Sequence, residues 1–500
     1  MIIIEKVQFF NNNFFYHLDN FLYIGGKNMR KILIIFIVGL FILSGIAVSG
    51  FSQKAISIIN GSEEYNMVII APNKFSSQIQ PLIIHKNSLG VQTLLKTTED
   101  IYKDFQGRDK PEQIKYFIKF AIETYNISYV LLMGGKIGDT NNWYLPVRYV
   151  ELDDGAGRGI YYISDLYYSD IYKNGDEFED WDSNGDNTIA QWPQDKFDLH
   201  PDVCIGRLPC RNTDEVDTVV EKIISYETNT ARQPWFDNMV VIGGDTFPDY
   251  PGYEGEITCD YAADFMQGFN IIKLYYSLGT ITSSTEVKNA INAGCGFLFT
   301  RAKGGIDRIR VPRSDGTEII ALHNDDIKEL TNKDKYPVMV LGECIHGKFD
   351  KVKTRTKSYP LIFSQLIYRI IEFLKKITGK SEPFDDEQPV TTLNECIAWR
   401  LVNKEGGGGI AVLTNTHICY AMIGDANQNG IPDDVETFGG FLAVEVFRLY
   451  NEEHMNILGE IHSKTIENYV STHPVNTNNI HCKSVQEWVL IGDPSLQIGG

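Results

Sequence analysis

Short runs of apolar, strand-forming residues recur along the chain, and stretches with helical spacing lie between them. Nine such runs predict strands, at residues 67–71, 91–95, 129–133, 203–206, 239–243, 271–275, 296–299, 338–342 and 410–413. Apolar residues recur at helical spacing in segments 113–125, 213–227 and 284–293. Strands that are apolar throughout are buried on both faces, and their alternation with helices favours mostly parallel sheets covered on both sides. We therefore expect an α/β fold.

The chain has a natural division near residues 231–235, where a predicted helix ends before a new strand begins. A length of 500 residues is enough for two or three structural units. We expect two tandem α/β/α sandwich units, a first one over residues 63–233 and a second one over residues 236–500.

Charge and cysteine content exclude several classes of protein. The chain has 46 Lys and Arg against 65 Asp and Glu, a formal net charge of −19. Such an acidic surface repels phosphate backbones, so we expect no nucleic-acid partner. The eight cysteines are scattered, and none forms a CxxC pair. They therefore predict neither a disulfide-stapled scaffold nor a zinc cage.

The segment 29–50 has the composition of a secretory signal. Met29, Arg30 and Lys31 precede a long apolar run, and the small residues Ala47 and Ser49 come before a possible cleavage site. The run approaches the ~20 residues that span a bilayer, so an uncleaved N-terminal anchor is the alternative. Residues 1–28 are then an N-terminal extension or a mis-assigned start. We expect the functional chain to be secreted or held on the extracellular cell surface.

A basic segment at residues 351–380 differs from the acidic remainder of the chain. Within it, residues 361–377 have the pattern of an amphipathic helix. This pattern is typical of a packed helix with a solvated basic face, and also of an interfacial helix on an anionic membrane. We therefore expect membrane contact only through the N-terminal segment or through this helix.

Cys344 follows the apolar strand 338–342 and precedes a turn that contains glycine. Open α/β sheets place their ligands at the carboxyl ends of parallel strands. A thiol there, beside turn amides that can bind an oxyanion, is a candidate nucleophile. A buried structural cysteine is the alternative, because free cysteine is commonly buried.

Several ordered segments together carry a family resemblance. They are residues 164–170, 201–209, 394–400, 408–416 and 491–496, and the Cys-x-x-Gly-x-Phe pattern of Cys344, Gly347 and Phe349. In these segments the chain resembles the gingipain family of cysteine peptidases, relatives of the caspases. The resemblance implies a caspase-like catalytic unit preceded by a related, non-catalytic one. It also implies cysteine-type endopeptidase activity on protein or peptide substrates, with Cys344 as the nucleophile.

The resemblance places Lys303 where members of the family have the histidine of the catalytic dyad, in the turn 302–304. A lysine ammonium can favour a nearby thiolate, but it passes a proton poorly to a leaving amine at neutral pH. His346 and His323 are possible substitutes, and each is also explained as an ordinary surface or packing histidine. Two functions therefore stay open: an impaired endopeptidase, and a catalytically silent pseudo-peptidase that binds peptides or other surfaces outside the cell.

Residues 425–436 match the calcium-loop pattern D-x-[DN]-x-[DN]-G-x₅-E. The expected ligands are the side chains of Asp425, Asn427, Asn429, Asp433 and Glu436 and the backbone carbonyl of Ile431. A second loop begins in the same way, with Asp180, Asp182, Asn184 and Asp186, but it has Gln191 in place of the final glutamate. We expect structural Ca²⁺ in the first loop and weaker binding in the second.

Overall fold

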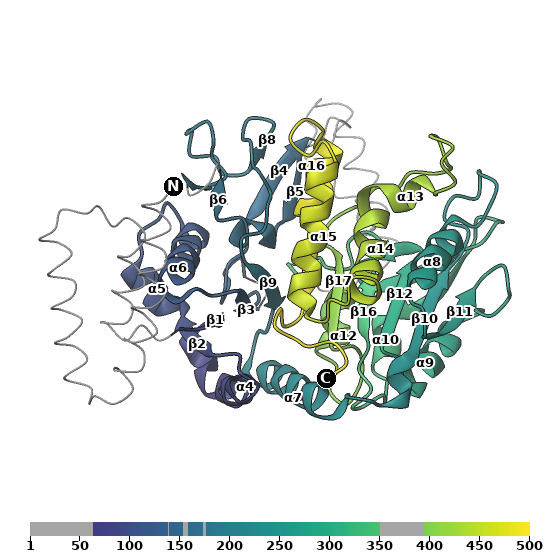
Figure 1. The fold of residues 1–500 in the computed structure, drawn as a ribbon, viewed down its shortest axis with the longest axis horizontal. Coiled ribbons are helices and arrows are strands. Elements are labelled where there is room, and N and C mark those ends of the chain that lie inside the picture. Colours follow the sequence, from purple (N-terminus) through teal and green to yellow (C-terminus); the bar gives the residue numbers. More distant parts are fainter. Residues whose placement is uncertain (1–63, 139, 154–158, 174–176, 351–394) are drawn as a thin grey trace, which may run out of the picture. The chain divides into compact units, whose positions relative to one another are not determined.

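A ten-stranded β-sheet organises the part of the chain that the structure describes (Figure 1). Its strands lie in the order β11 (Asn270–Tyr275), β10 (Asn238–Gly243), β12 (Phe297–Arg301), β16 (Val338–Leu341), β17 (Ala411–Asn415), β18 (Trp488–Ile491), β9 (Cys204–Leu208), β3 (Tyr129–Met133), β1 (Met67–Ala71) and β2 (Thr93–Thr97). Every neighbouring pair is parallel except β17 and β18, which are antiparallel.

The computed structural model describes residues 64–500 except 139, 154–158, 174–176 and 351–394. Residues Tyr65–Gly500 form one compact unit. The predicted signal or anchor at 29–50, the extension 1–28 and the predicted basic helix at 361–377 lie outside the described residues. No helix in the described ranges is long and apolar enough to cross a membrane.

The predicted strands and the parallel sheet are confirmed. Each of the nine predicted runs overlaps one of the strands β1, β2, β3, β9, β10, β11, β12, β16 and β17. Strands that precede residue 233 occupy one end of the sheet, and those that follow it occupy the other. The last strand, β18, lies between these two groups and pairs with both β17 and β9. The two predicted units therefore share one continuous sheet.

The three predicted helices are also found, as α6 (Lys110–Tyr125), α7 (Thr213–Asn229) and α9 (Ser284–Ala293). Each begins after a side chain that accepts a hydrogen bond from a first-turn amide: Asp109 for α6, Asn212 for α7 and Ser283 for α9. Such caps satisfy amides that have no partner within the helix. Within the described ranges, the remaining α-helices are α4 (Ser76–Ser88), α5 (Thr98–Asp104), α8 (Glu254–Phe265), α10 (Asn324–Ile327), α12 (Ile397–Val402), α13 (Asp433–Glu436), α14 (Phe438–Asn451), α15 (Leu458–Thr472) and α16 (Asn479–Gln486).

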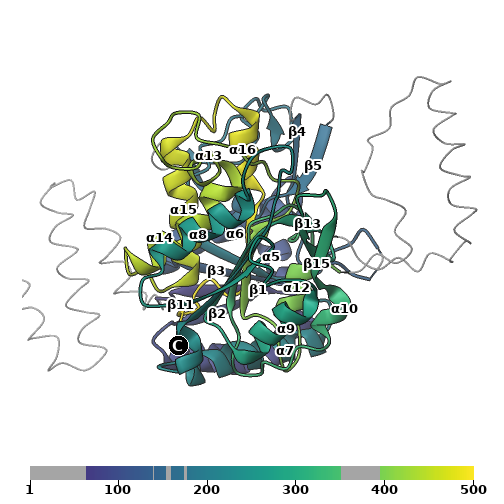
Figure 2. The same cartoon turned by 90° about the vertical axis from the view of Figure 1, so that its right-hand side faces the viewer.

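Helices cover both faces of the sheet around β16. Helices α8, α14 and α15 pack on one face, and α9, α10 and α12 lie on the other (Figure 2). Three small sheets extend this framework, formed by β13 (Lys303–Gly305), β14 (Arg308–Pro312) and β15 (Glu318–His323), by β4 (Tyr149–Asp153), β5 (Gly159–Ile163) and β8 (Gln191–Trp192), and by β6 (Tyr172–Lys173) and β7 (Glu177–Phe178).

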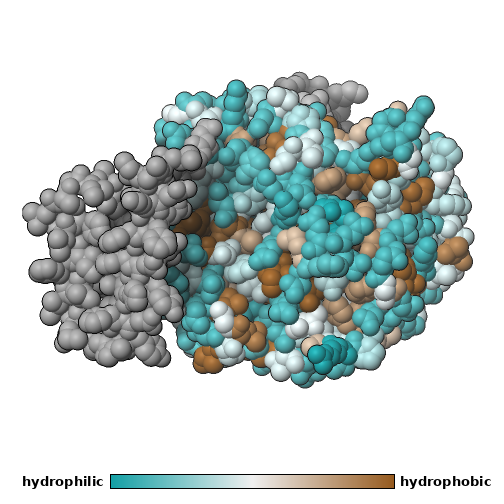
Figure 3. Space-filling model, viewed as in Figure 1, coloured by the Kyte–Doolittle hydropathy of each residue, from teal (hydrophilic) through white to brown (hydrophobic). Residues whose placement is uncertain are grey.

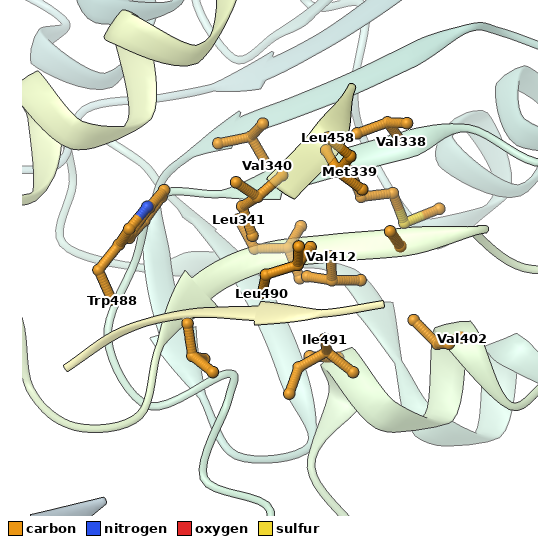
Figure 4. Close-up of a cluster of buried hydrophobic side chains, with 14 of the residues drawn as sticks. Val338, Met339, Val340, Leu341, Val402, Val412, Leu458, Trp488, Leu490 and Ile491 are labelled. Atoms are coloured by element: carbon orange, nitrogen blue, oxygen red, sulfur yellow. The ribbon is translucent and has the colours of Figure 1, made fainter. Parts of the chain in front are cut away.

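The centre of the sheet is a continuous apolar core. All four residues of β16 are buried, and they pack beside Val412 of β17 and Leu490 of β18 (Figure 4). Burial of each valine or leucine side chain stabilises the folded state by about 1.5–3 kcal/mol. The outer surface contrasts with this core, because the face in Figure 3 is largely hydrophilic and its hydrophobic areas are small and separate. The core therefore fixes β16, whose carboxyl end carries the candidate nucleophile.

Candidate active site

Cys344 lies on the loop that follows β16, three residues beyond Leu341, and is half-buried. The loop bends sharply at Ile345, whose φ of 54° is in the left-handed region that β-branched residues rarely adopt. Two backbone hydrogen bonds to the segment after β17 hold this bend: Ile345 donates to the His417 carbonyl at 2.9 Å and Gly347 to the Asn415 carbonyl at 2.9 Å. The thiol is therefore presented at the carboxyl ends of two adjacent parallel strands.

The turn 302–304 lies directly against this loop. A Cβ atom on Gly304 would stand 2.1 Å from the Cys344 carbonyl oxygen and 2.9 Å from its amide nitrogen. Only glycine permits so close an approach of the two backbones. The turn that the resemblance associates with the dyad base is thus a neighbour of the thiol-bearing loop.

Lys303 begins β13, where it pairs with Arg310 of β14. Its ammonium lies 3.9 Å from the Glu318 carboxylate on β15, and its side chain is 40% exposed. Arg310 shares the same carboxylate at 3.1 Å. Lys303 is therefore a partly exposed cation, next to the glycine that contacts Cys344, and its carboxylate partner Glu318 lies on β15.

The two other candidate histidines have partners away from the sulfur. His346 is fully buried, with Nε2 3.1 Å from the Arg308 carbonyl oxygen and Nδ1 3.4 Å from a Glu343 carboxylate oxygen. The left-handed bend at Ile345 breaks the extended backbone that would have placed His346 on the side of Cys344. His323 lies 3.2 Å from Asp307 and caps α10. Within the described residues, neither ring makes a hydrogen bond to Cys344.

Cys419 is a neighbour that the sequence analysis missed. Its sulfur lies 3.6 Å from the Cys344 sulfur, and its carbonyl oxygen lies 3.5 Å from that same sulfur. The two residues are 75 positions apart, so no local spacing relates them. Cys344 and Cys419 each follow a predicted strand, and loops at the carboxyl ends of adjacent parallel strands meet. This is the only feature of the sequence that points to their contact.

Two buried cations complete the surroundings of the thiol. Lys483 of α16 is fully buried and pairs with Glu487 at 2.5 Å. Arg301 at the end of β12 pairs with Asp434, its Nε lying 2.8 Å from Oδ2. Each pair holds its cation in place, so both positive charges act on the site as fixed charges.

The pKa values follow from these contacts. The hydrogen bond from the Cys419 thiol is the largest influence that lowers the pKa of Cys344, and the Cys419 backbone, Lys483 and Arg301 also lower it. Together they bring the pKa of Cys344 to about 6 against the opposing effect of burial. The same hydrogen bond and burial raise the pKa of Cys419 well above its ordinary value. The pair therefore holds one thiolate, on Cys344, at neutral pH.

The backbone amide of Cys344 has no hydrogen-bond acceptor among the residues that the structure describes. A donor of this kind, next to a nucleophilic sulfur, can hold the oxyanion that develops when a carbonyl is attacked. Thiolate and amide together can perform the first step of acyl transfer.

The predicted calcium loop, residues 425–436, brings its oxygen-bearing side chains together. The amide nitrogens of Asn427 and Asn429 lie 3.0 and 2.7 Å from the two carboxylate oxygens of Glu436. Asp425 accepts hydrogen bonds from the backbone of Asn429 and Gly430, and Gly430 takes a φ of 84°. The Asn427 and Asn429 side chains thus present nitrogen donors to Glu436, and the described residues hold no group of three or more His, Cys, Asp or Glu side chains placed to bind a metal ion, so the Ca²⁺ site stays a prediction from the loop pattern.

The second loop is arranged differently. The Arg108 guanidinium pairs with Asp180 at 2.8 Å and also with Asp182. Asn184 donates to Asp186 at 3.0 Å. The Arg108 side chain therefore neutralises two of the carboxylates that the loop would offer to a metal.

A thiol on the loop after a central parallel strand, beside a glycine-containing turn from the preceding strand, defines the class of caspase-like cysteine peptidase folds. Within this class, the chain belongs to peptidase family C25, the gingipain family. The model of Peptidase family C25 matches residues 60–365 and 372–499.

Relatives of known sequence and structure agree with this assignment. Gingipain R2 of Porphyromonas gingivalis is 22% identical over 296 residues, which cover 58% of this chain and 33% of that protein. An uncharacterized protein of Archaeoglobus fulgidus is 19% identical over 309 residues, covering 59% of this chain and 69% of that protein. The chain thus matches about a third of the length of Gingipain R2.

Among solved structures, the Arg-specific cysteine proteinase gingipain R is similar with a TM-score of 0.56 and 19% identity, covering 87% of this chain and 78% of that one. The complex of the Porphyromonas gingivalis RgpB pro- and mature domains gives a TM-score of 0.56 and 20% identity, covering 87% and 79%. These similarities show that the fold is shared.

Proposed function

We propose that this chain is a cysteine-type endopeptidase that hydrolyses peptide bonds through the Cys344 thiolate. The proposal rests on the surroundings of the Cys344 sulfur. In a chain of family C25, this sulfur lies on the loop after the central strand β16, and Cys419, Lys483 and Arg301 stabilise its thiolate. A thiolate is the reactive form of cysteine, and most ordinary cysteines are protonated at pH 7.

In the proposed reaction, the thiolate attacks the peptide carbonyl and the amide of Cys344 holds the oxyanion. The leaving amine then needs a proton. Lys303 is the candidate donor, because Gly304 places its backbone against Cys344. Its ammonium would have to leave Glu318, and a lysine passes protons less readily than a histidine in general acid–base catalysis, so we expect slow turnover.

The alternative is a pseudo-peptidase that binds peptides without cleaving them. The resemblance, which places Lys303 at the dyad position, favours it, as do the partners of His346 and His323, which lie away from the sulfur. In this case the loops at the carboxyl end of β16 would serve recognition alone. The two functions share a substrate class and differ only in proton transfer.

We also propose that the chain acts outside the cell, where a structural Ca²⁺ occupies the loop 425–436. The signal-like composition of residues 29–50 supports the location, and the match of residues 425–436 to the calcium-loop pattern supports the metal.

Labelling of the thiol tests the first proposal. A peptidyl electrophile should modify Cys344 in the purified chain, and Cys344→Ala should abolish both the labelling and the cleavage of a peptide library. Peptide binding without labelling or cleavage between pH 5 and 10 would favour the pseudo-peptidase.

The Lys303→His variant tests the proton-transfer step. Restoring a base with a pKa near neutrality should raise turnover by about 10²–10⁴-fold, the usual contribution of general acid–base catalysis. The matched control is Lys328→His, at an exposed position directly after α10, which should leave turnover unchanged. A folded Lys303→His variant with no gain would mean that another part of the site limits the reaction.

A further inference from the structure

The two sulfurs at the ends of β16 and β17 are close enough to react with each other. They lie 3.6 Å apart, and a disulfide bond is about 2.05 Å long, so a modest turn of the side chains brings them together. All eight cysteines of the chain are described and free, and this is the one pair among them whose sulfurs are in contact. The hydrogen bonds of Ile345 to His417 and of Gly347 to Asn415 keep the two loops side by side.

We propose that Cys344 and Cys419 form a reversible disulfide by exchange with a soluble aliphatic disulfide. The pair is thus a covalent modification site. The consequence for catalysis rests on the proposed function: a disulfide consumes the nucleophile and closes the site, and reduction restores it.

The exchange has two balanced steps. The Cys344 thiolate attacks one sulfur of the external disulfide, so a mixed disulfide forms on Cys344 and one thiolate leaves. Cys419 then gives its proton to that thiolate and attacks the sulfur of Cys344, which releases the second external thiolate. The two protein sulfurs lose two electrons, and the external disulfide gains them and becomes one thiol and one thiolate.

The electrostatics of the pair favour this order. The attacking thiol works best with a pKa near the ambient pH, and the pKa of Cys344 is about 6. Cys419 stays protonated because its hydrogen bond to Cys344 and the charge there raise its pKa. The mixed disulfide removes both of these influences, while Arg301 continues to lower the pKa of Cys419. Cys419 therefore becomes the resolving thiol only after Cys344 has reacted.

Mass spectrometry of the full chain tests the proposal. The protein is treated with oxidised glutathione, its remaining thiols are alkylated, and it is digested with trypsin without reductant. Trypsin should release residues 336–348 with Cys344 as their only cysteine, and residues 405–448 with Cys419 as theirs. We expect these two peptides joined with the loss of two hydrogen atoms, and separated again by dithiothreitol.

Two variants sharpen the test. Cys419→Ser should stop the reaction at the first step and leave glutathione on the peptide 336–348. Cys204→Ser, which changes another half-buried cysteine, should still give the joined peptides. A stable glutathione adduct on Cys344 in the unaltered chain, or the absence of joined peptides at any concentration of oxidised glutathione, would overturn the proposal.

Cleavage assays separate this proposal from the proposed function. If the joined peptides form but the reduced protein cleaves nothing, the modification site stands and the endopeptidase does not. If the reduced protein cleaves peptides and the joined form cleaves them equally fast, the disulfide does not close the site.

Discussion

The reactivity of Cys344 depends on a few side chains within reach of its sulfur. The closest is Cys419, and the buried cations Lys483 and Arg301 act from further away. Burial alone would raise the pKa of a thiol, because it penalises the thiolate. Here the hydrogen bond and the two positive charges outweigh burial, so a half-buried cysteine is a stronger nucleophile than an exposed one at neutral pH.

The first prediction concerns the pH dependence of this thiol. Because the pKa of Cys344 is about 6, its alkylation by iodoacetamide should reach half its maximal rate near pH 6. An ordinary cysteine reaches that point near pH ~8.5. In Cys419→Ala the thiolate loses its hydrogen-bond donor, so the midpoint should move to higher pH and the rate at pH 7 should fall.

Cys419→Ser is the matched variant for this prediction, since its hydroxyl keeps a donor at the same place and the midpoint should stay low. Peptide-resolved mass spectrometry measures the rate at Cys344 separately from the other thiols. Equal midpoints in the alanine and serine variants would mean that Cys419 does not control the thiolate.

The elements around the site differ in how far the sequence predicted them. The nine long apolar runs gave the correct strands because a strand buried on both faces leaves a clear pattern. β18 was missed although its apolar run of four residues is as long as the recognised runs 203–206 and 410–413. In the small sheet of β13, β14 and β15, β14 was missed because arginines alternate with its apolar residues.

The site was predictable only in part, for related reasons. Cys344 was found because it follows a recognisable strand, and the turn 302–304 was found through the family resemblance. Cys419 also follows a strand, but nothing in the local sequence relates it or Lys483 to Cys344, because loop conformation and helix packing bring them to the sulfur from distant parts of the sequence. The orientation of His346 depends on one left-handed residue, Ile345, which side-chain patterns do not reveal.

The loop that leads into α13 gives a prediction at the scale of an element. If Ca²⁺ occupies residues 425–436, removing it with a chelator should lower the melting temperature. A ligand present at 100 times its dissociation constant stabilises the folded state by about 2.7 kcal/mol. Glu436→Gln removes the bidentate anchor that accepts from Asn427 and Asn429, so this variant should melt at the same temperature with and without calcium.

Differential scanning calorimetry with and without a chelator measures this effect. Glu452→Gln, at an exposed position after α14, provides the control and should keep the full calcium response. A melting temperature that does not change with calcium in the unaltered chain would rule out a structural metal in this loop.

At the scale of the whole described unit, β18 connects the two groups of strands. It pairs with β17 on one side and with β9 on the other, although it comes last in the chain. A buried ion pair strengthens the same junction: Lys86 of α4 lies 2.8 Å from Asp493, just after β18, and 2.7 Å from Glu227 of α7. Because both groups of strands depend on one strand, we infer that they unfold together.

The Leu490→Ala variant tests this inference, since Leu490 lies in β18 and is 1% exposed. Removing a buried leucine side chain usually costs about 2–5 kcal/mol, whereas the same change at Leu278, which is 60% exposed, should cost at most about 0.5 kcal/mol. Hydrogen exchange should then show faster exchange by a similar factor in β3 and in β16, on opposite sides of β18, because both open through the same global transition. Faster exchange confined to one of these strands would mean that the sheet consists of two independently folding halves, and that the thiol-bearing strand owes little of its stability to the first half of the chain.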